Sequence, residues 1–294
     1  YISRYWADPS RAEQIDRRLK VDEKLGAEDM KSILNEITSP FAQEYSKLFY
    51  ENYTQGFSVK ADEMYDILNG WDGIESLDST AAVAFHAIYI HLIQNLFQDE
   101  LQSFGNDSFD TFYSLKYIRS LAIRKIFDGE ASLWIDNVLS EKEETLNDIV
   151  NQSFHDAHVF LENNYGNPKD LTWGQVHQVT YRHRLDGDPI VKKLIHFSVG
   201  PYPMAGSGMT PRAASYSVSS PFDVRAGSSM RRVIDFSDFD NGSSILPTGQ
   251  SGVFKSSHYS DQTSLYNKGE FKLFKFSESA IKEDSSMRRL IFIK

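Results

Sequence analysis

The hydrophobic pattern of this chain changes its period near residue 166, and no other feature of the sequence constrains the fold as strongly. Before that point apolar residues recur every three or four positions, as in Ile33, Leu34 and Ile37, which is typical of amphipathic helices. After it, apolar and polar residues alternate, as over residues 230–236, which is typical of strands. Helices followed by strands predict an α+β fold. We therefore divide the 294 residues into a mainly helical region, 1–165, and a mainly β region, 166–294.

Local signals predict where individual elements begin and turn. Ser10 and Glu13 have the spacing of a capping box, and Ser39-Pro40 is a typical helix start. Asn241-Gly242 predicts a hairpin turn, because both residues tolerate a positive φ. The small residues 204–208 predict a flexible turn. Further helices are expected over residues 61–68, 80–97, 115–126 and 141–161, and strands over 176–181, 213–218 and 269–276.

Composition excludes several classes of function. The formal net charge is −10, whereas proteins that bind the nucleic-acid backbone present a basic face, so we expect no nucleic-acid partner. The chain has no cysteine, which excludes disulfides, thiolate metal ligands and a cysteine nucleophile. The longest apolar run, residues 81–93, is interrupted by His86 and His91 and is too short to span a bilayer, so we expect no membrane insertion.

General catalytic motifs are nearly absent from the sequence. Ser207 and Ser251 each lie beside glycines, but neither stands in the G-x-S-x-G pattern of a nucleophile elbow. No glycine-rich phosphate-binding motif is present. No carboxylate stands isolated in an apolar segment that would raise its pKa. The histidines near the strands are interpreted as structural: His177, His183 and His196.

Two groups of residues leave a metal site open as an alternative. His155 and His158 are three residues apart on one expected helix, a geometry that can chelate zinc, although the pattern lacks the glutamate of H-E-x-x-H. A metal-dependent hydrolase using these histidines is therefore one hypothesis. Three aspartates near Gly242, with the spacing of a calcium loop but without its distal glutamate, are the other candidates: Asp235, Asp238 and Asp240.

Five short motifs then occur in one order along nearly the whole chain. They are Trp6 followed by Arg11, W-D-G at residues 71–73, W-G-x-x-H at 173–177, G-Q-S-G at 249–252 and H-Y-x-D-Q at 258–262. Together they resemble the C-terminal part of the large chain of the penicillin acylase (penicillin amidase) family of N-terminal-nucleophile hydrolases. We interpret Gln250, His258, Asp261 and Gln262 as structural residues that form buried hydrogen bonds.

The resemblance implies an αββα sandwich with a helical insertion and a precursor that cuts itself. In that family the new N-terminal serine of the large chain attacks a linear amide, with its own α-amine as the base. An asparagine and a backbone N–H stabilise the oxyanion. Of this set only the supporting arginine is carried over, onto Arg11, because the residues that match the serine and asparagine precede Tyr1. The resemblance therefore implies a hydrolase whose C-terminal portion is this chain, and we expect that portion alone to be inactive.

The same resemblance implies the partners, cofactors and location. The partners are the rest of the same precursor, namely the small chain and the N-terminal part of the large chain, and a small acyl-amide substrate. We expect no cofactor in this chain, and calcium only in the full-length parent. Analogy with the family places the protein in the periplasm or outside the cell. The alternative to the enzyme is a non-catalytic binding or scaffold relative with the same fold.

Overall fold

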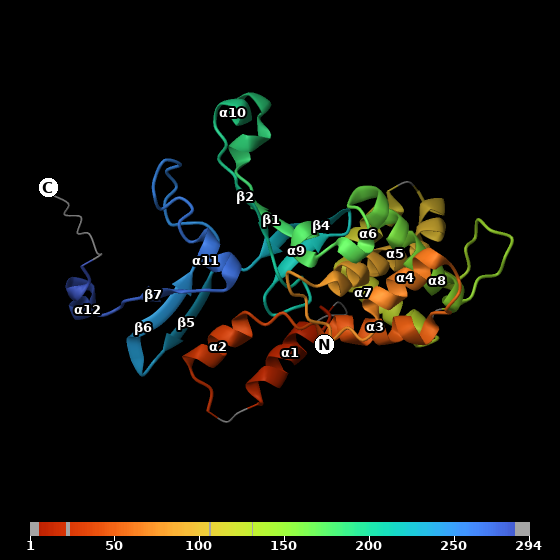
Figure 1. Ribbon diagram of the computed structural model, residues 1–294, viewed down its shortest axis with the longest axis horizontal. Coiled ribbons are helices and arrows are strands. Elements are labelled where there is room, and N and C mark those ends of the chain that lie inside the picture. The colour runs from red at the N-terminus through yellow and green to blue at the C-terminus, as the bar shows by residue number, and fades with distance from the viewer. Residues whose placement is uncertain (1–5, 22–23, 106, 131, 286–294) are drawn as a thin grey trace. The chain divides into compact units, whose positions relative to one another are not determined.

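The computed structural model describes residues 6–21, 24–105, 107–130 and 132–285 (Figure 1). Trp6, the first residue of the resemblance, is the first of these residues. The structure has both helices and sheets, which confirms the α+β class. The chain forms two compact units, and the chain passes between them more than once: unit 1 comprises residues 1–18, 36–179 and 202–227, and unit 2 comprises 19–35, 180–201 and 228–294.

Unit 1 is built mainly from helices. Three of them begin where a serine accepts a backbone hydrogen bond: Ser39 from Ala42 N, Ser58 from Ala61 N and Ser79 from Ala82 N. The helices are α1 (Ser10–Leu19), α3 (Pro40–Asn52), α4 (Val59–Leu68), α5 (Thr80–Ser103), α6 (Ser108–Ser114), α7 (Lys116–Phe127), α8 (Leu146–Asn164) and α9 (Trp173–Val176), with short 3₁₀ turns at Ser132–Trp134 and Pro168–Asp170.

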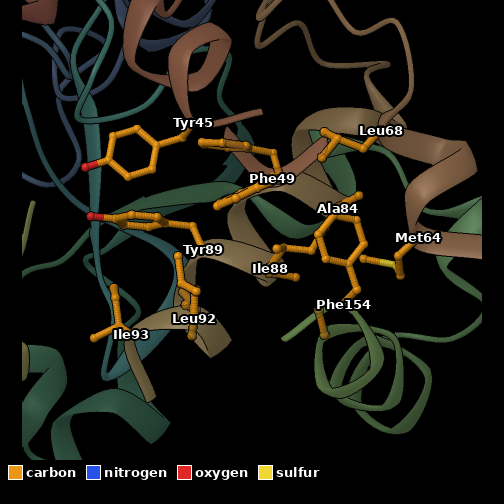
Figure 2. Close-up of a cluster of buried hydrophobic side chains, with 14 of the residues drawn as sticks. Tyr45, Phe49, Met64, Leu68, Ala84, Ile88, Tyr89, Leu92, Ile93 and Phe154 are labelled. Carbon is orange, nitrogen blue, oxygen red and sulfur yellow. The ribbon is translucent and has the colours of Figure 1, made fainter. Parts of the chain in front are cut away.

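The core of unit 1 surrounds α5, which contacts both α4 and α8. Figure 2 shows this cluster, in which aromatic side chains of α3 meet aliphatic side chains of α5 and Phe154 of α8. Phe49 and Phe154 pack edge to face with centroids 6.1 Å apart, and both are fully buried. Full burial of such a side chain stabilises a fold by about 1.5–3 kcal/mol, so this cluster holds the helices of unit 1 together.

Helix α5 is longer than the apolar run that the sequence indicates. Its 24 residues are long and apolar enough to cross a membrane by length and composition, but 72% of the apolar window is buried inside the structure. Leu92, Ile93 and Leu96 have no exposed surface. The expectation that this segment is too short to span a bilayer was therefore wrong, because the helix continues to Ser103. Its burial is typical of the core helix of a folded protein.

A four-stranded sheet has the order β2-β1-β4-β3. It comprises β1 (Gln178–Tyr181), β2 (Val199–Pro203), β3 (Ala214–Ser217) and β4 (Ser220–Gly227). Strands β1 and β4 are parallel, with Val179 opposite Val224, and β3 and β4 are antiparallel with register shifts at Tyr216. Strands β2 and β4 were not predicted from the sequence. Strand β4 contains Pro221 and a positive φ of 67° at Phe222, neither of which is typical of a strand.

Unit 2 contains an antiparallel sheet of order β5-β6-β7, formed by β5 (Arg231–Asp235), β6 (Asp238–Ile245) and β7 (Lys272–Phe274). Its helices are α2 (Ala27–Leu34), α10 (Pro189–Leu194), α11 (Thr263–Lys268) and α12 (Glu278–Glu283), with a 3₁₀ turn at Arg184–Gly187. Helix α2 contacts β5, and Asn35 donates from Nδ2 to the carbonyl of Gly269 at 2.7 Å.

The expected hairpin turn at Asn241-Gly242 was wrong, because both residues lie inside β6. The turn lies between β5 and β6, where the Asp235 carboxylate accepts hydrogen bonds from the backbone N–H and hydroxyl of Ser237. Gly242 instead pairs with Phe274 of β7, and a Cβ built on it would lie 3.3 Å from the Phe274 ring. The glycine therefore serves close strand packing and not a turn.

Candidate functional site

Arg11, the one residue carried over to the active site, lies in the first turn of α1 with an exposed side chain. The expected Ser10 capping box was wrong: the Asp8 carboxylate accepts from Ser10 N at 3.0 Å, and Glu13 N donates to the Pro9 carbonyl. Within the described part of the chain no hydrogen bond or ion pair holds the Arg11 guanidinium. Its role at the oxyanion stays a prediction.

The W-D-G motif forms a tight turn that leads to a buried carboxyl group. The Asp72 carboxylate accepts from Ile74 N at 2.9 Å, and the indole N–H of Trp71 donates to the Ile74 carbonyl. Gly73 has φ +78°, and a Cβ there would approach Gln43 Cγ to 2.6 Å and the Ser39 carbonyl to 3.0 Å. Only glycine fits this position without displacement. The turn places Glu75, which has no exposed surface, inside unit 1.

Glu75 begins a buried polar chain that the sequence analysis missed. Its Oε1 lies 3.3 Å from Nε2 of His86, and Nδ1 of His86 lies 3.0 Å from the hydroxyl of Tyr216. Burial raises the pKa of Tyr216 well above its usual value, so that hydroxyl stays protonated. The one signal in the sequence was His86, a polar residue within an apolar helical run.

The W-G-x-x-H motif packs against this chain of polar groups. Trp173 is fully buried, donates from its indole N–H to the Gly206 carbonyl at 3.1 Å, and stacks between His86 and His177, with centroids 4.5 and 4.2 Å away. The structural interpretation of His177 is supported by its Nδ1, which lies 2.7 Å from the Phe222 carbonyl. Burial lowers the pKa of His177 to about 3, so the ring is neutral at physiological pH.

Gly174 of the same motif allows a close approach of two backbone segments. Its N–H donates to the Leu77 carbonyl at 2.7 Å, and a Cβ would lie 3.1 Å from that oxygen. The glycine therefore lets the start of α9 approach the segment before α5.

The G-Q-S-G and H-Y-x-D-Q motifs meet in unit 2 and have structural roles. A Cβ on Gly249 would lie 1.9 Å from the His258 carbonyl, which accepts a hydrogen bond from Ser251 N. Buried Gln262 accepts from Leu246 N, and Asp261 bonds Lys272 Nζ at 2.9 Å and His258 Nδ1 at 3.2 Å. Burial was wrongly expected for three of these residues, because Gln250, His258 and Asp261 are exposed.

Comparison with known proteins shows which family has this sequence pattern. A family model described as penicillin amidase matches residues 1–283. The chain belongs to the penicillin amidase family. Curated relatives of the family include proteins named acyl-homoserine lactone acylase QuiP, from Pseudomonas aeruginosa at 24% identity over 98% of this chain and from Pseudomonas syringae pv. syringae at 22% over 98%.

A solved structure of a thermostable penicillin G acylase from Alcaligenes faecalis matches 99% of the chain with a TM-score of 0.54 at 14% identity. This match confirms the expected N-terminal-nucleophile hydrolase fold. The chain spans 37% and 36% of the length of the two Pseudomonas relatives and 53% of the Alcaligenes chain.

Within this penicillin amidase chain, neither candidate serine is arranged as a nucleophile. Ser207 is buried, and its Oγ accepts a hydrogen bond from Met209 N at 3.0 Å. Ser251 Oγ accepts from Val253 N. The turn around Ser207 requires a glycine: Gly206 has φ +80°, and a Cβ there would lie 2.5 Å from the Arg212 carbonyl.

The alternative metal residues are held by separate partners. His155 Nδ1 lies 2.9 Å from Ser58 Oγ, whereas His158 Nε2 lies 3.0 Å from Glu63 Oε2. The carboxylates of Asp235, Asp238 and Asp240 bond Ser237, Asn241 and the 276–277 backbone respectively. Over residues 6–285, leaving out those not described, no group of three or more His, Asp or Glu side chains could hold a metal ion.

One carboxyl group contradicts the expectation that none has a raised pKa. Both side-chain oxygens of Glu100 are buried and lack a hydrogen-bond partner among the described residues. Burial, together with neighbouring Asp99 and Asp136, raises the pKa of Glu100 to about 8. Sequence reasoning missed it because Asp99 and Glu100 are adjacent acidic residues, which resemble a solvated helix face.

Proposed function

We propose that this chain is the C-terminal portion of an acylase that hydrolyses a linear amide bond through an N-terminal serine supplied by an upstream part of the same precursor. The family match over residues 1–283 carries the proposal. The relatives are named acylases, and the chain spans about a third of their length. The precursor would process itself to expose that serine.

Arg11 is the residue of this chain that we assign to the oxyanion, as a positioning group. Its exposed guanidinium has five donors in a fixed plane, which suits it to hold an amide side chain and to add positive potential near developing negative charge. Arg17, on the same helix and also exposed, provides a matched control.

The substrate class that we propose first is an N-acyl-homoserine lactone, since two Pseudomonas relatives carry that activity in their names. Phenylacetyl amides, as in penicillin G, are the second class, because the Alcaligenes protein of the same fold is named a penicillin G acylase. Both substrates present a linear acyl-amide bond and release a primary amine, which an amine-reactive fluorogenic reagent detects.

The test uses the full-length parent, purified from its source, in three forms: wild type, Arg11→Ala and Arg17→Ala. We expect the wild type to release amine from one of the two substrate classes and its large chain to begin with serine. Loss of a group that orients a catalytic side chain costs about 10- to 100-fold, so Arg11→Ala should lower kcat by that factor with KM nearly unchanged. Arg17→Ala should leave both parameters unchanged.

The alternative is a non-catalytic relative that binds acyl amides or other partners. An uncut parent that turns over neither substrate would support it and contradict the enzyme. An active, processed parent whose kcat is unaffected by Arg11→Ala would contradict the assignment of Arg11 alone.

Location and calcium complete the proposal. We place the parent in the periplasm or outside the cell, and fractionation with immunodetection tests this. We place any calcium site in the upstream part, and metal analysis of the purified parent tests it.

A further inference from the structure

Unit 1 contains a small cavity that the proposed reaction does not use. Its volume is about 40 Å³, and it lies between the helices and the turn that precedes β3. One probe sphere of water occupies about 10–15 Å³, so the space suits a single small ion rather than an organic substrate. The polar side chains that line it are His86, Tyr89, Arg119, Ser207, Ser215 and Tyr216, and its apolar wall includes Phe41, Met209 and Val218.

Arg119 of α7 brings a buried positive charge to this cavity. The residue is 5% exposed, and its Nη1 donates to the Tyr113 carbonyl. Its Nε is buried without a hydrogen-bond partner among the described residues. No ion pair with Arg119 occurs in that part of the chain, whereas Arg124 on the same helix lies 2.9 Å from Glu44 and 4.0 Å from Asp8. A buried charge without a counter-charge destabilises the fold, so binding of an anion beside Arg119 would be favourable.

Two tyrosines that line the cavity with Arg119, Tyr89 and Tyr216, carry neutral hydroxyl groups that can donate to that anion. Burial raises the pKa of Tyr89 to about 12 and raises those of Tyr113 and Tyr216 as well, so all three hydroxyls stay protonated. Tyr113 lies beside Arg119, with the guanidinium carbon 5.6 Å from its ring centroid, and its buried hydroxyl has no partner among the described residues. Tyr113 does not line the cavity itself, so the buried donor without an acceptor at the cavity wall is Arg119 Nε.

Two carboxylates act on the tyrosines of this cavity, Glu75 on Tyr216 and Asp8 on Tyr89. Asp8 lies 4.0 Å from Arg124, and His86 lies between Glu75 and Tyr216. The two ring nitrogens of His86 face opposite ways, Nε2 toward Glu75 at 3.3 Å and Nδ1 toward Tyr216 at 3.0 Å. The Glu75 carboxyl therefore does not fill the role of counter-ion to Arg119.

We propose that this cavity binds one small monovalent anion of halide size, held by the Arg119 guanidinium and by tyrosine hydroxyls. The cavity volume excludes bulky anions, and the lone cation favours a single negative charge. Chloride is the halide that we use as the probe, and bromide is its heavier substitute.

The first experiment compares thermal unfolding of the chain in sodium chloride and in sodium gluconate at equal ionic strength. Gluconate is too large for the cavity. With chloride at ten times its dissociation constant, the melting temperature should rise by about 2 °C relative to gluconate. Arg119→Met should abolish this difference. Arg124→Met, which removes a half-exposed arginine of the same helix, should retain it. Equal melting temperatures of the wild type in the two salts would overturn the proposal.

A second experiment does not depend on the stability of a variant. Wild-type crystals grown in low-millimolar sodium bromide should show an anomalous scattering peak within about 4 Å of Arg119 Nε, a distance typical of an ion pair. A peak there supports the site even if Arg119→Met fails to fold. An ordered cavity without such a peak contradicts it.

Discussion

Replacing Trp173 by phenylalanine tests whether the stacked tryptophan holds the turn at Gly206 against unit 1. The indole N–H donates to the Gly206 carbonyl at 3.1 Å, and phenylalanine cannot replace that donor. Leaving a buried acceptor without its partner costs about 1–3 kcal/mol. The smaller ring leaves about 40 Å³ unfilled, which costs about 1 kcal/mol at 24 cal/mol per Å³. Stacking on His86 and His177 is retained in part, because one six-membered ring remains.

We therefore expect Trp173→Phe to lower the free energy of unfolding by about 2–4 kcal/mol. The measurement is urea unfolding followed by circular dichroism at 222 nm. The control is Trp6→Phe, since the Trp6 side chain is 65% exposed and its loss should change stability by less than about 0.5 kcal/mol. A Trp173→Phe variant as stable as the control would refute the assignment of the tryptophan as a buried donor that holds the turn at Gly206.

Gly206→Ala should destabilise the chain by more than Gly56→Ala. Both glycines have a positive φ, but of the two only Gly206 has backbone within 2.5 Å of a new Cβ. The urea midpoints of the two variants measure the difference, and equal losses of unfolding free energy would show that the positive φ alone causes the destabilisation. Asp148→Asn should remove an acid-sensitive contribution to stability: Lys142 and Thr145 lower the pKa of Asp148 from 3.8 to about 2, so its stabilisation is complete above pH 3.8 and is lost as the pH falls through 2. Urea unfolding between pH 5 and pH 2 should then show a shallower decline in the variant than in the wild type. Glu100→Gln should stabilise the chain above pH 4.5, because a folded pKa of about 8 means that the folded state keeps a proton that the unfolded state releases between these values. Urea unfolding at pH 5 and pH 8 measures this gain in stability, and Glu141→Gln, at an exposed position, is the control. If the stabilities of Glu100→Gln and the wild type change equally between these pH values, the pKa of Glu100 is not raised.

Helix starts could be predicted from sequence because their signals are local. Ser39 lies three residues from the N–H that it accepts, and Ser58 and Ser79 repeat the same geometry in the next helices. Strand β4 could not be predicted in this way. Its register includes a positive φ at Phe222, which the tertiary packing imposes and no residue preference reveals.

The candidate site, like the fold, was predictable from sequence only where the signals are local. The order of the five motifs could be read from the sequence, and it led to the family. The buried chain of Glu75, His86 and Tyr216 could not, because His86 and Tyr216 are 130 residues apart and their pairing depends on the folded turn at Gly73. Likewise, Asp240 fits a calcium loop by spacing, yet it accepts hydrogen bonds from the distant 276–277 backbone.

The division of the chain into two interleaved units has a consequence for its synthesis. Unit 1 takes its last segment from residues 202–227, after the chain has already supplied residues 19–35 and 180–201 to unit 2. During translation the helical core can collapse early, but the indole N–H of Trp173 has no acceptor until Gly206 leaves the ribosome. The nascent chain must therefore keep α5 and α8 associated while the strands are still being made. A truncation at residue 165 would yield a polypeptide with an unfinished first unit, and a genetic dissection of this protein must follow its spatial and not its linear boundaries.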